Sequence, residues 1–134
     1  MRWQQEWDEA VTGRQTHSVW PNIENRLKCR WVRTDFYLTQ FWTGHGNYRA
    51  KLASFELVGD TMCDECGAED TPTHAVFECP TVQEDVLRLR AALHRLRVDF
   101  DPQSMVGKKQ SFELFARHVQ QVMGARAILH PFYN

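Results

Sequence analysis

The sequence lacks a long hydrophobic run and an excess of charge of either sign. Its apolar stretches fall far short of the roughly 18 residues that a membrane span needs, and residues 1–9 have no apolar stretch typical of a signal peptide. Sixteen lysines and arginines nearly balance seventeen aspartates and glutamates, giving a formal net charge of −1. This balance speaks against a uniformly cationic, histone-like nucleic-acid binder. The 12% share of aromatic residues speaks against a disordered acidic tail.

Cysteine is also scarce, with four residues in 134. In a chain without a leader, four cysteines favour a reducing compartment, in which metal binding is commoner than disulfide formation. We therefore expect an intracellular protein of the nucleus or cytoplasm, with no membrane partner. The length predicts one domain over residues 1–134. Within it we expect an N-terminal helix and basic connection (1–34), a core (35–100), and a C-terminal helix and tail (101–134).

The spacing of apolar residues predicts a mainly α-helical fold. The first helix is expected to run through Trp3 and Trp7, with Gly13 as its C-cap, before an irregular connection over residues 14–22. Asp35 is a good N-cap for a helix over 36–42. Further helices or turns are expected over 23–31, 48–59, 81–97, from Asp101, and over 112–123.

Residues 81–97 carry two patterns. Thr81 and Glu84 have the spacing of a capping box. An apolar seam then steps by four, three, four and three residues through Val82, Val86, Leu89, Leu93 and Leu96. We interpret the seam as core; the alternative is that it pairs with a second chain.

The near-zero net charge hides a polarity along the chain. Residues 14–51 contain seven basic and two acidic residues, a net charge of +5, whereas residues 52–87 contain nine acids and no lysine or arginine. Such asymmetry indicates where a charged partner could bind, or it reflects two blocks that neutralise each other in the fold.

The most informative motif is Cys63-x2-Cys66-x7-His74-x4-Cys79, followed by Pro80. Its four sulfur and nitrogen ligands suit one tetrahedral, structural Zn²⁺ with no open position. The alternatives are buried cysteines with a core histidine, or a redox pair, which should follow a strand of a βαβ unit that is not apparent here.

His74 should lie on a helix that begins at Thr71 and Pro72. Residues five apart lie about 140° from each other around a regular helix. This helix must therefore end or distort before Cys79, as Pro80 also predicts. Cys29 has no partner at metal spacing and is expected in the core.

Five acids, Asp64, Glu65, Glu69, Asp70 and Glu78, should surround the metal and repel phosphate. A nucleic-acid surface is therefore expected in the basic block, at Arg26, Lys28, Arg30, Arg33, Arg49 and Lys51. Of the aromatic residues, Trp31, Trp42 or Tyr48 would stack on bases if they are exposed.

Four segments together resemble the C-terminal cysteine-histidine region of non-LTR (LINE-like) retrotransposon reverse transcriptases. They are residues 36–46 with 48–52, the cysteine motif itself, His74–Pro80, and an upstream segment with Trp3, Trp7, Gly13–Thr16 and Pro21. The resemblance covers residues ~3 to ~125. No Tyr-x-Asp-Asp polymerase motif occurs, so the chain is expected to be a fragment or a domesticated stand-alone derivative.

The resemblance implies a zinc-stapled module that binds RNA or DNA, with Cys63, Cys66, His74 and Cys79 as ligands. We expect no enzymatic activity. Two-metal phosphoryl transfer needs clustered carboxylates, and the only candidates for a nuclease-like set are Asp99 and Asp101 with Lys108 and Lys109, of which Asp101 with Pro102 is better interpreted as a helix start. The alternative is a domesticated protein-interaction or homodimerisation module with a structural zinc, docking through the helix 81–97.

Overall fold

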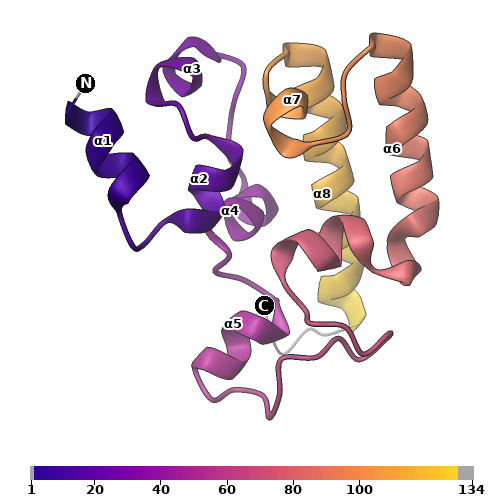
Figure 1. Cartoon of the computed structure of the whole chain (residues 1–134). Coiled ribbons are helices and arrows are strands. Elements are labelled where there is room, and N and C mark those ends of the chain that lie inside the picture. Colours follow the sequence, from indigo (N-terminus) through magenta and orange to yellow (C-terminus); the bar gives the residue numbers. More distant parts are fainter. Residues whose placement is uncertain (1, 130–134) are drawn as a thin grey trace.

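The structure is a computed structural model that describes residues 2–129, in which one hydrophobic core cluster joins segments from α2 to α8 (Figure 1). Apart from one isolated antiparallel bridge between Met62 and Glu69, these residues contain no β-structure. The expected mainly α-helical fold is therefore confirmed. The elements are α1 (Arg2–Glu9), α2 (Arg14–Val19), α3 (Ile23–Lys28), α4 (Phe36–Thr43), α5 (Arg49–Ser54), η1 (His74–Glu78), η2 (Pro80–Val82), α6 (Gln83–Leu96), α7 (Pro102–Val106) and α8 (Lys109–Leu129).

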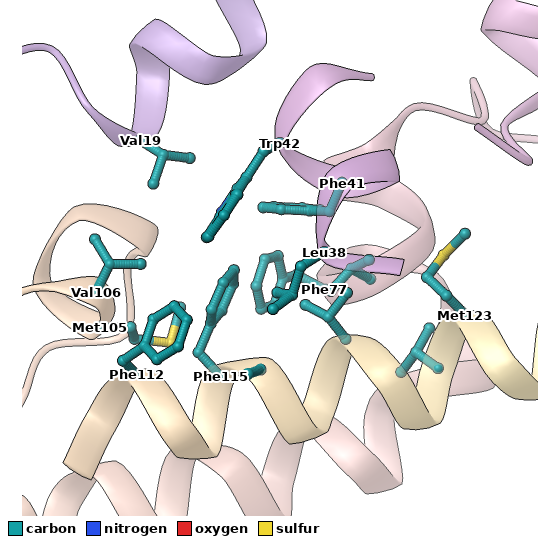
Figure 2. Packing of buried hydrophobic residues seen from close by; sticks show 14 of the residues in the cluster. Val19, Leu38, Phe41, Trp42, Phe77, Met105, Val106, Phe112, Phe115 and Met123 are labelled. Carbon is teal, nitrogen blue, oxygen red and sulfur yellow. The ribbon is translucent and has the colours of Figure 1, made fainter. Parts of the chain in front are cut away.

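The long helix α8 is the centre of the fold, because α4, α6, α7 and η1 all pack against it. Its predicted apolar stripe is buried: Phe112, Phe115 and Val119 are 0% exposed. Figure 2 shows Phe112 and Phe115 projecting from α8 towards the side chains of α4, with Phe77 of η1 between them. The C-terminal helix is thus an integral part of the core.

Helix α6 lies beside α8 and buries its predicted seam within the chain. Val86, Leu89 and Leu93 are at most 5% exposed. The core interpretation of this seam is confirmed, and these three side chains are not available to a second chain. The predicted capping box is wrong: α6 begins at Gln83, after the 3₁₀ turn η2, and has no side-chain cap at its N-terminus.

The N-terminal region differs most from expectation. Helix α1 ends at Glu9, and Gly13 precedes α2 instead of capping α1. The segment expected to be irregular contains α2, because tertiary contacts hold it. The Arg14 guanidinium donates to the carbonyls of Trp7 and Asp8 at the end of α1, and the Thr16 hydroxyl donates to the Trp42 carbonyl at 2.7 Å.

Local capping explains the elements that were predicted well. The Asp35 carboxylate accepts hydrogen bonds from the N–H groups of Tyr37 and Leu38, both at 2.9 Å, and α4 ends at Gly44, whose φ of 72° favours glycine. Asp101 caps α7 by accepting from the Ser104 N–H at 2.9 Å. Helix α5 ends at Ser54, earlier than the expected end near Gly59.

No helix among the described residues has the length and apolar character needed to cross a membrane.

Candidate metal centre

A tight hairpin presents the first two cysteines. The N–H of Asp70 donates to the Thr61 carbonyl at 2.9 Å, and the N–H of Cys63 donates to the Ala68 carbonyl at 2.7 Å. The chain reverses between them through the Gly67 N–H, which donates to the Cys63 carbonyl at 2.9 Å. Gly67 has a φ of +79°, a left-handed conformation that glycine adopts without steric cost. The turn places the thiols of Cys63 and Cys66 on one side of the hairpin.

Backbone and hydroxyl donors surround the sulfur atoms. Burial raises the pKa of the Cys63 thiol, while the N–H groups of Glu65 and Cys66 point at its sulfur and oppose that rise. Burial also acts to raise the pKa of Cys79, but hydrogen bonds from the side chain and N–H of Thr81, together with those from Cys63 and Cys66, outweigh it, so the pKa of Cys79 is lowered. The Thr81 hydroxyl lies 3.1 Å from the Cys79 sulfur. These donors favour thiolates, which are the forms that bind metal.

The helical segment that carries His74 distorts as the ligand spacing requires. The Thr71 hydroxyl oxygen accepts the His74 N–H at 3.2 Å. Residues His74–Glu78 then form a π-helical turn, in which the Cys79 N–H donates to the His74 carbonyl five residues back at 2.8 Å. Cys79 itself leaves the helix, with a ψ of 135°, directly before Pro80. The predicted distortion is confirmed.

The four predicted ligand side chains lie together. The sulfur atoms of Cys63, Cys66 and Cys79 and a ring nitrogen of His74 all lie within 4.8 Å of one another. The Cys63 and Cys79 sulfurs are 3.9 Å apart, and the Cys66 sulfur is 3.3 Å from Nε2 of His74. Tetrahedral bonds of about 2.3 Å to sulfur and 2.0 Å to nitrogen give ligand separations of about 3.8 Å and 3.5 Å. The cluster therefore has the spacing to hold one metal ion.

The segment between the last two ligands is part of the core. Ala75, Val76 and Phe77 are at most 8% exposed. The Phe77 ring lies 5.7 Å from Phe41 and is stacked 5.5 Å from His118, and Nε2 of His118 donates to the Val76 carbonyl at 2.7 Å. The position of His74 and Cys79 is therefore coupled to the packing of α4 and α8.

Four of the five acids expected around the cluster are exposed, but Asp70 is completely buried. Its Oδ2 accepts the Arg49 N–H at 2.8 Å and pairs with the Arg126 guanidinium of α8. Nε of Arg126 also donates to the Asn47 carbonyl at 2.7 Å. Asp70 therefore attaches the hairpin to α5 and α8 and does not contribute an exposed charge. Sequence reasoning missed Arg126, which lies 56 residues from Asp70.

The predicted nucleic-acid residues do not form one free surface. Arg33 pairs with Glu113 at 3.2 Å. Arg49 lies 3.5 Å from Asp60 and 3.4 Å from Asp64, and its side chain is 14% exposed. Two others lie over aromatic rings, Arg26 over Trp20 at 5.3 Å and Lys51 over Phe55 at 5.0 Å. The remaining two, Lys28 and Arg30, are exposed and form no ion pair with any residue in the range 2–129.

The aromatic residues considered for stacking on bases are mostly unavailable. Trp42 is 6% exposed and Tyr48 is 0% exposed, because both belong to the core. Trp31 is half-buried, and its Nε1 donates to the Val106 carbonyl at 3.0 Å. Cys29 lies in the core at 8% exposure, as expected.

Comparison with known proteins reveals two relatives. The chain is 35% identical over 83 residues to a retrovirus-related Pol polyprotein from type-1 retrotransposable element R1 4 of Nasonia vitripennis. The matched residues make up 61% of this chain and 21% of that protein. It is also 35% identical over 85 residues to the corresponding R1 polyprotein of Popillia japonica, covering 62% of this chain and 32% of that protein. Both relatives are retrotransposon Pol polyproteins.

About 60% of the chain is thus related to retrotransposon Pol, in agreement with the resemblance seen in the sequence motifs. The matched region is a fifth to a third of the length of these relatives. No protein-family model and no solved structure matches the chain.

Proposed function

We propose that this chain is a non-catalytic, zinc-stapled nucleic-acid-binding module derived from the reverse transcriptase of a non-LTR retrotransposon. The observation that carries the proposal is the Cys₃His cluster at tetrahedral spacing in a chain related to retrotransposon Pol. The relation to retrotransposon Pol, together with the resemblance to the C-terminal region of non-LTR reverse transcriptases, supports nucleic acid as the proposed ligand class.

Zinc is the metal that suits the donor set. Three thiolates and one imidazole are soft to borderline ligands in a tetrahedral arrangement, and Zn²⁺ accepts both without redox chemistry. Four protein ligands leave no position for a substrate, so the ion would be structural. It would close the 61–70 hairpin against the π-helical turn and thereby hold Phe77 in the core.

Metal analysis tests this part directly. We expect one zinc per purified chain, and loss of far-UV helix signal on chelation, because structural zinc contributes folding free energy. His74→Ala should lose zinc and aggregate, whereas His94→Ala, which alters an exposed histidine on α6, should keep a full complement. Well under one zinc per folded wild-type chain would contradict the assignment.

A non-catalytic role is supported by the surroundings of the nuclease-like set considered above, Asp99 and Asp101 with Lys108 and Lys109. Asp101 accepts from both the N–H and the hydroxyl of Ser104, so its two oxygens cap α7. Asp99, the other carboxylate of the set, is exposed. We expect the purified chain to cleave neither RNA nor DNA in the presence of Mg²⁺ or Mn²⁺.

Nucleic-acid binding is tested by filter binding or fluorescence anisotropy at low salt, with RNA and DNA oligonucleotides. We expect binding that weakens steeply as salt rises, since phosphate contacts release counterions. Absence of binding at 50 mM salt would refute this part of the proposal.

A protein partner is the second candidate, favoured by one observation. Phe55 and Leu57 after α5 are 61% and 55% exposed, and Met62 on the hairpin is 48% exposed. Such side chains are typical of a contact surface when they lie together. A salt-resistant dimer in sedimentation equilibrium, combined with no affinity for nucleic acid, would favour this candidate.

A further inference from the structure

The ends of three helices meet at one end of the molecule, far from the metal centre. Helices α6 and α8 lie in contact and run antiparallel, as the colours along the two helices show (Figure 1). The C-terminal end of α6 therefore lies beside the N-terminal end of α8. Helix α3 reaches the same end, because Lys28 lines a cavity together with Gln103 and Gly107 of the α7 region (Figure 1).

This end carries a group of exposed cations that sequence order alone does not reveal. We name it the cationic end, and its members are Lys28, Arg30, Arg95, Arg97, Lys108 and Lys109. All six are exposed, and none forms an ion pair within residues 2–129. The exposed acids near these cations in the sequence are Glu24 on α3 and Asp99 after α6, whereas the exposed Glu84 lies at the other end of α6. Asp101 caps α7 and Glu113 pairs with Arg33, so the balance of unpaired charge remains positive.

The opposite end of the molecule would repel the same ligand. The hairpin carries Asp60, Asp64, Glu65 and Glu69, all exposed, and Arg49 is engaged there by Asp60 and Asp64. A metal ion with three thiolates adds a net charge of −1. A polyanion approaching the molecule is therefore directed away from the metal centre and towards the cationic end.

We propose that the cationic end is the face on which a nucleic-acid backbone docks, through phosphate contacts and without reading bases. The inference rests on the proposed function, and it assigns that function to residues of α6 and of the α7–α8 connection that the sequence analysis did not select. It commits to phosphate contacts because the tryptophans on the segment leading to this end are engaged in the fold. Trp20 is 7% exposed, and the half-buried Trp31 packs against the core while its Nε1 donates to the Val106 carbonyl.

The number of cations sets the expected salt dependence. For single strands, the logarithm of the affinity falls with the logarithm of the salt concentration with a slope of about −0.7 for each phosphate contact. Six contacts predict a slope of about −4. A slope of about 0.7 per contact means that each contact strengthens binding about fivefold between 1 M and 0.1 M monovalent salt. Removing two contacts therefore weakens binding by about 25-fold at 0.1 M salt.

The test variant is Arg95→Gln/Arg97→Gly. Glutamine keeps the helix propensity of α6, and glycine suits position 97, whose φ is 57°. The matched control is Arg2→Gln/Arg88→Gln, which removes the same amount of charge from two exposed arginines. Arg2 pairs with Glu6 on α1, and Arg88 pairs with Glu84 and Asp85 on α6. A third variant, Arg26→Gln/Arg33→Gln, alters cations of the basic block outside the cationic end.

Affinity is measured by fluorescence anisotropy for a labelled 20-mer of oligo(U) and of oligo(dT), in 50 to 300 mM KCl, with zinc-loaded protein. We expect Arg95→Gln/Arg97→Gly to bind both oligonucleotides about 25-fold more weakly at 0.1 M salt, with a slope reduced by about 1.4. The Arg2→Gln/Arg88→Gln control should stay within about twofold of the wild type, because these cations lie outside the cationic end.

The outcomes separate this inference from the function on which it rests. If the wild type binds and Arg95→Gln/Arg97→Gly binds equally well while Arg26→Gln/Arg33→Gln is weakened, the docking face is elsewhere and the proposed function stands. Equal losses in the control and in the test variant would show an effect of net charge alone and would also overturn the assignment. If the wild type binds neither oligonucleotide, the inference and the proposed function fail together.

Discussion

The buried pair of Asp70 and Arg126 makes the sharpest prediction about stability. Asp70 is 0% exposed and the Arg126 side chain is 17% exposed. Removing one partner leaves a buried charge without its counterion, which typically costs 3–5 kcal/mol. We place Asp70→Ala at about 3 kcal/mol, the lower end of that range, because the Arg126 guanidinium still donates to the Asn47 carbonyl and keeps some contact with water. Arg126→Met should cost about 4 kcal/mol, because it leaves a fully buried carboxylate.

The double variant Asp70→Ala/Arg126→Met distinguishes the pair from two independent contacts. It removes both charges, so its loss should fall about 2–3 kcal/mol short of the sum of the single losses. The measurement is urea unfolding followed by far-UV circular dichroism, at pH 7 with excess zinc. Excess zinc keeps the metal centre loaded, so that the free energies of unfolding are compared in one metal state.

The matched control is the exposed pair of Arg33 and Glu113, whose side chains are 50% and 42% exposed. The same kind of cycle with Arg33→Met and Glu113→Ala should give a coupling below about 1 kcal/mol, because water screens exposed charges. If the Asp70 and Arg126 losses add to within 0.5 kcal/mol, the buried pair does not couple the hairpin to α8, and the reasoning is wrong.

Three further predictions concern single positions. Arg97→Gly should raise the free energy of unfolding by about 1 kcal/mol, because a left-handed φ of 57° strains an arginine but not a glycine. Equilibrium unfolding measures this change, and a loss of stability would contradict it. Thr81→Val should weaken zinc affinity about 10-fold or more in a chelator competition, because the hydroxyl next to the Cys79 sulfur is lost, whereas Thr81→Ser should preserve it. Burial lowers the pKa of His118 from its ordinary 6.5, so the unfolded chain binds the proton more readily, and stability is present above pH 6.5 and falls as the pH drops below it. His118→Gln, which can still donate to the Val76 carbonyl, should flatten this fall in urea titrations between pH 7 and pH 5, and an unchanged profile would contradict it.

The sequence predicted the metal-centre geometry well because its determinants are local. The Cys63-x2-Cys66 turn, the Thr71–Pro72 helix start and Pro80 each act within a few residues of a ligand. Together they required a distortion before Cys79, and the π-helical turn supplies it. The helices with side-chain N-caps at Asp35 and Asp101 were found for the same reason.

The elements that sequence reasoning missed depend on contacts between distant residues. Helix α2 is held by hydrogen bonds from its Arg14 to α1 and from its Thr16 to α4, and nothing within residues 14–22 indicates either contact. The burial of Asp70 likewise requires Arg126, which is far along the chain. Charge sums over sequence blocks fail in the same way, because they count Arg33 and Arg49 as free cations although the fold pairs both with carboxylates.

Because the metal centre and the cationic end lie apart, we expect the metal to affect nucleic-acid binding only indirectly, by stabilising the fold. The last two predicted metal ligands flank a core segment whose Phe77 ring contacts α4 and α8. Helix α8 begins at Lys109, at the same end of the molecule where α6 ends (Figure 1). We therefore expect metal loss to disturb the cationic end through the packing of η1, α6 and α8. This effect does not require a phosphate to approach the ion. It follows that nucleic-acid affinity should be lost on chelation in parallel with helix signal. Conversely, charge substitutions on the hairpin, such as Glu65→Gln, should leave the affinity nearly unchanged while zinc remains bound.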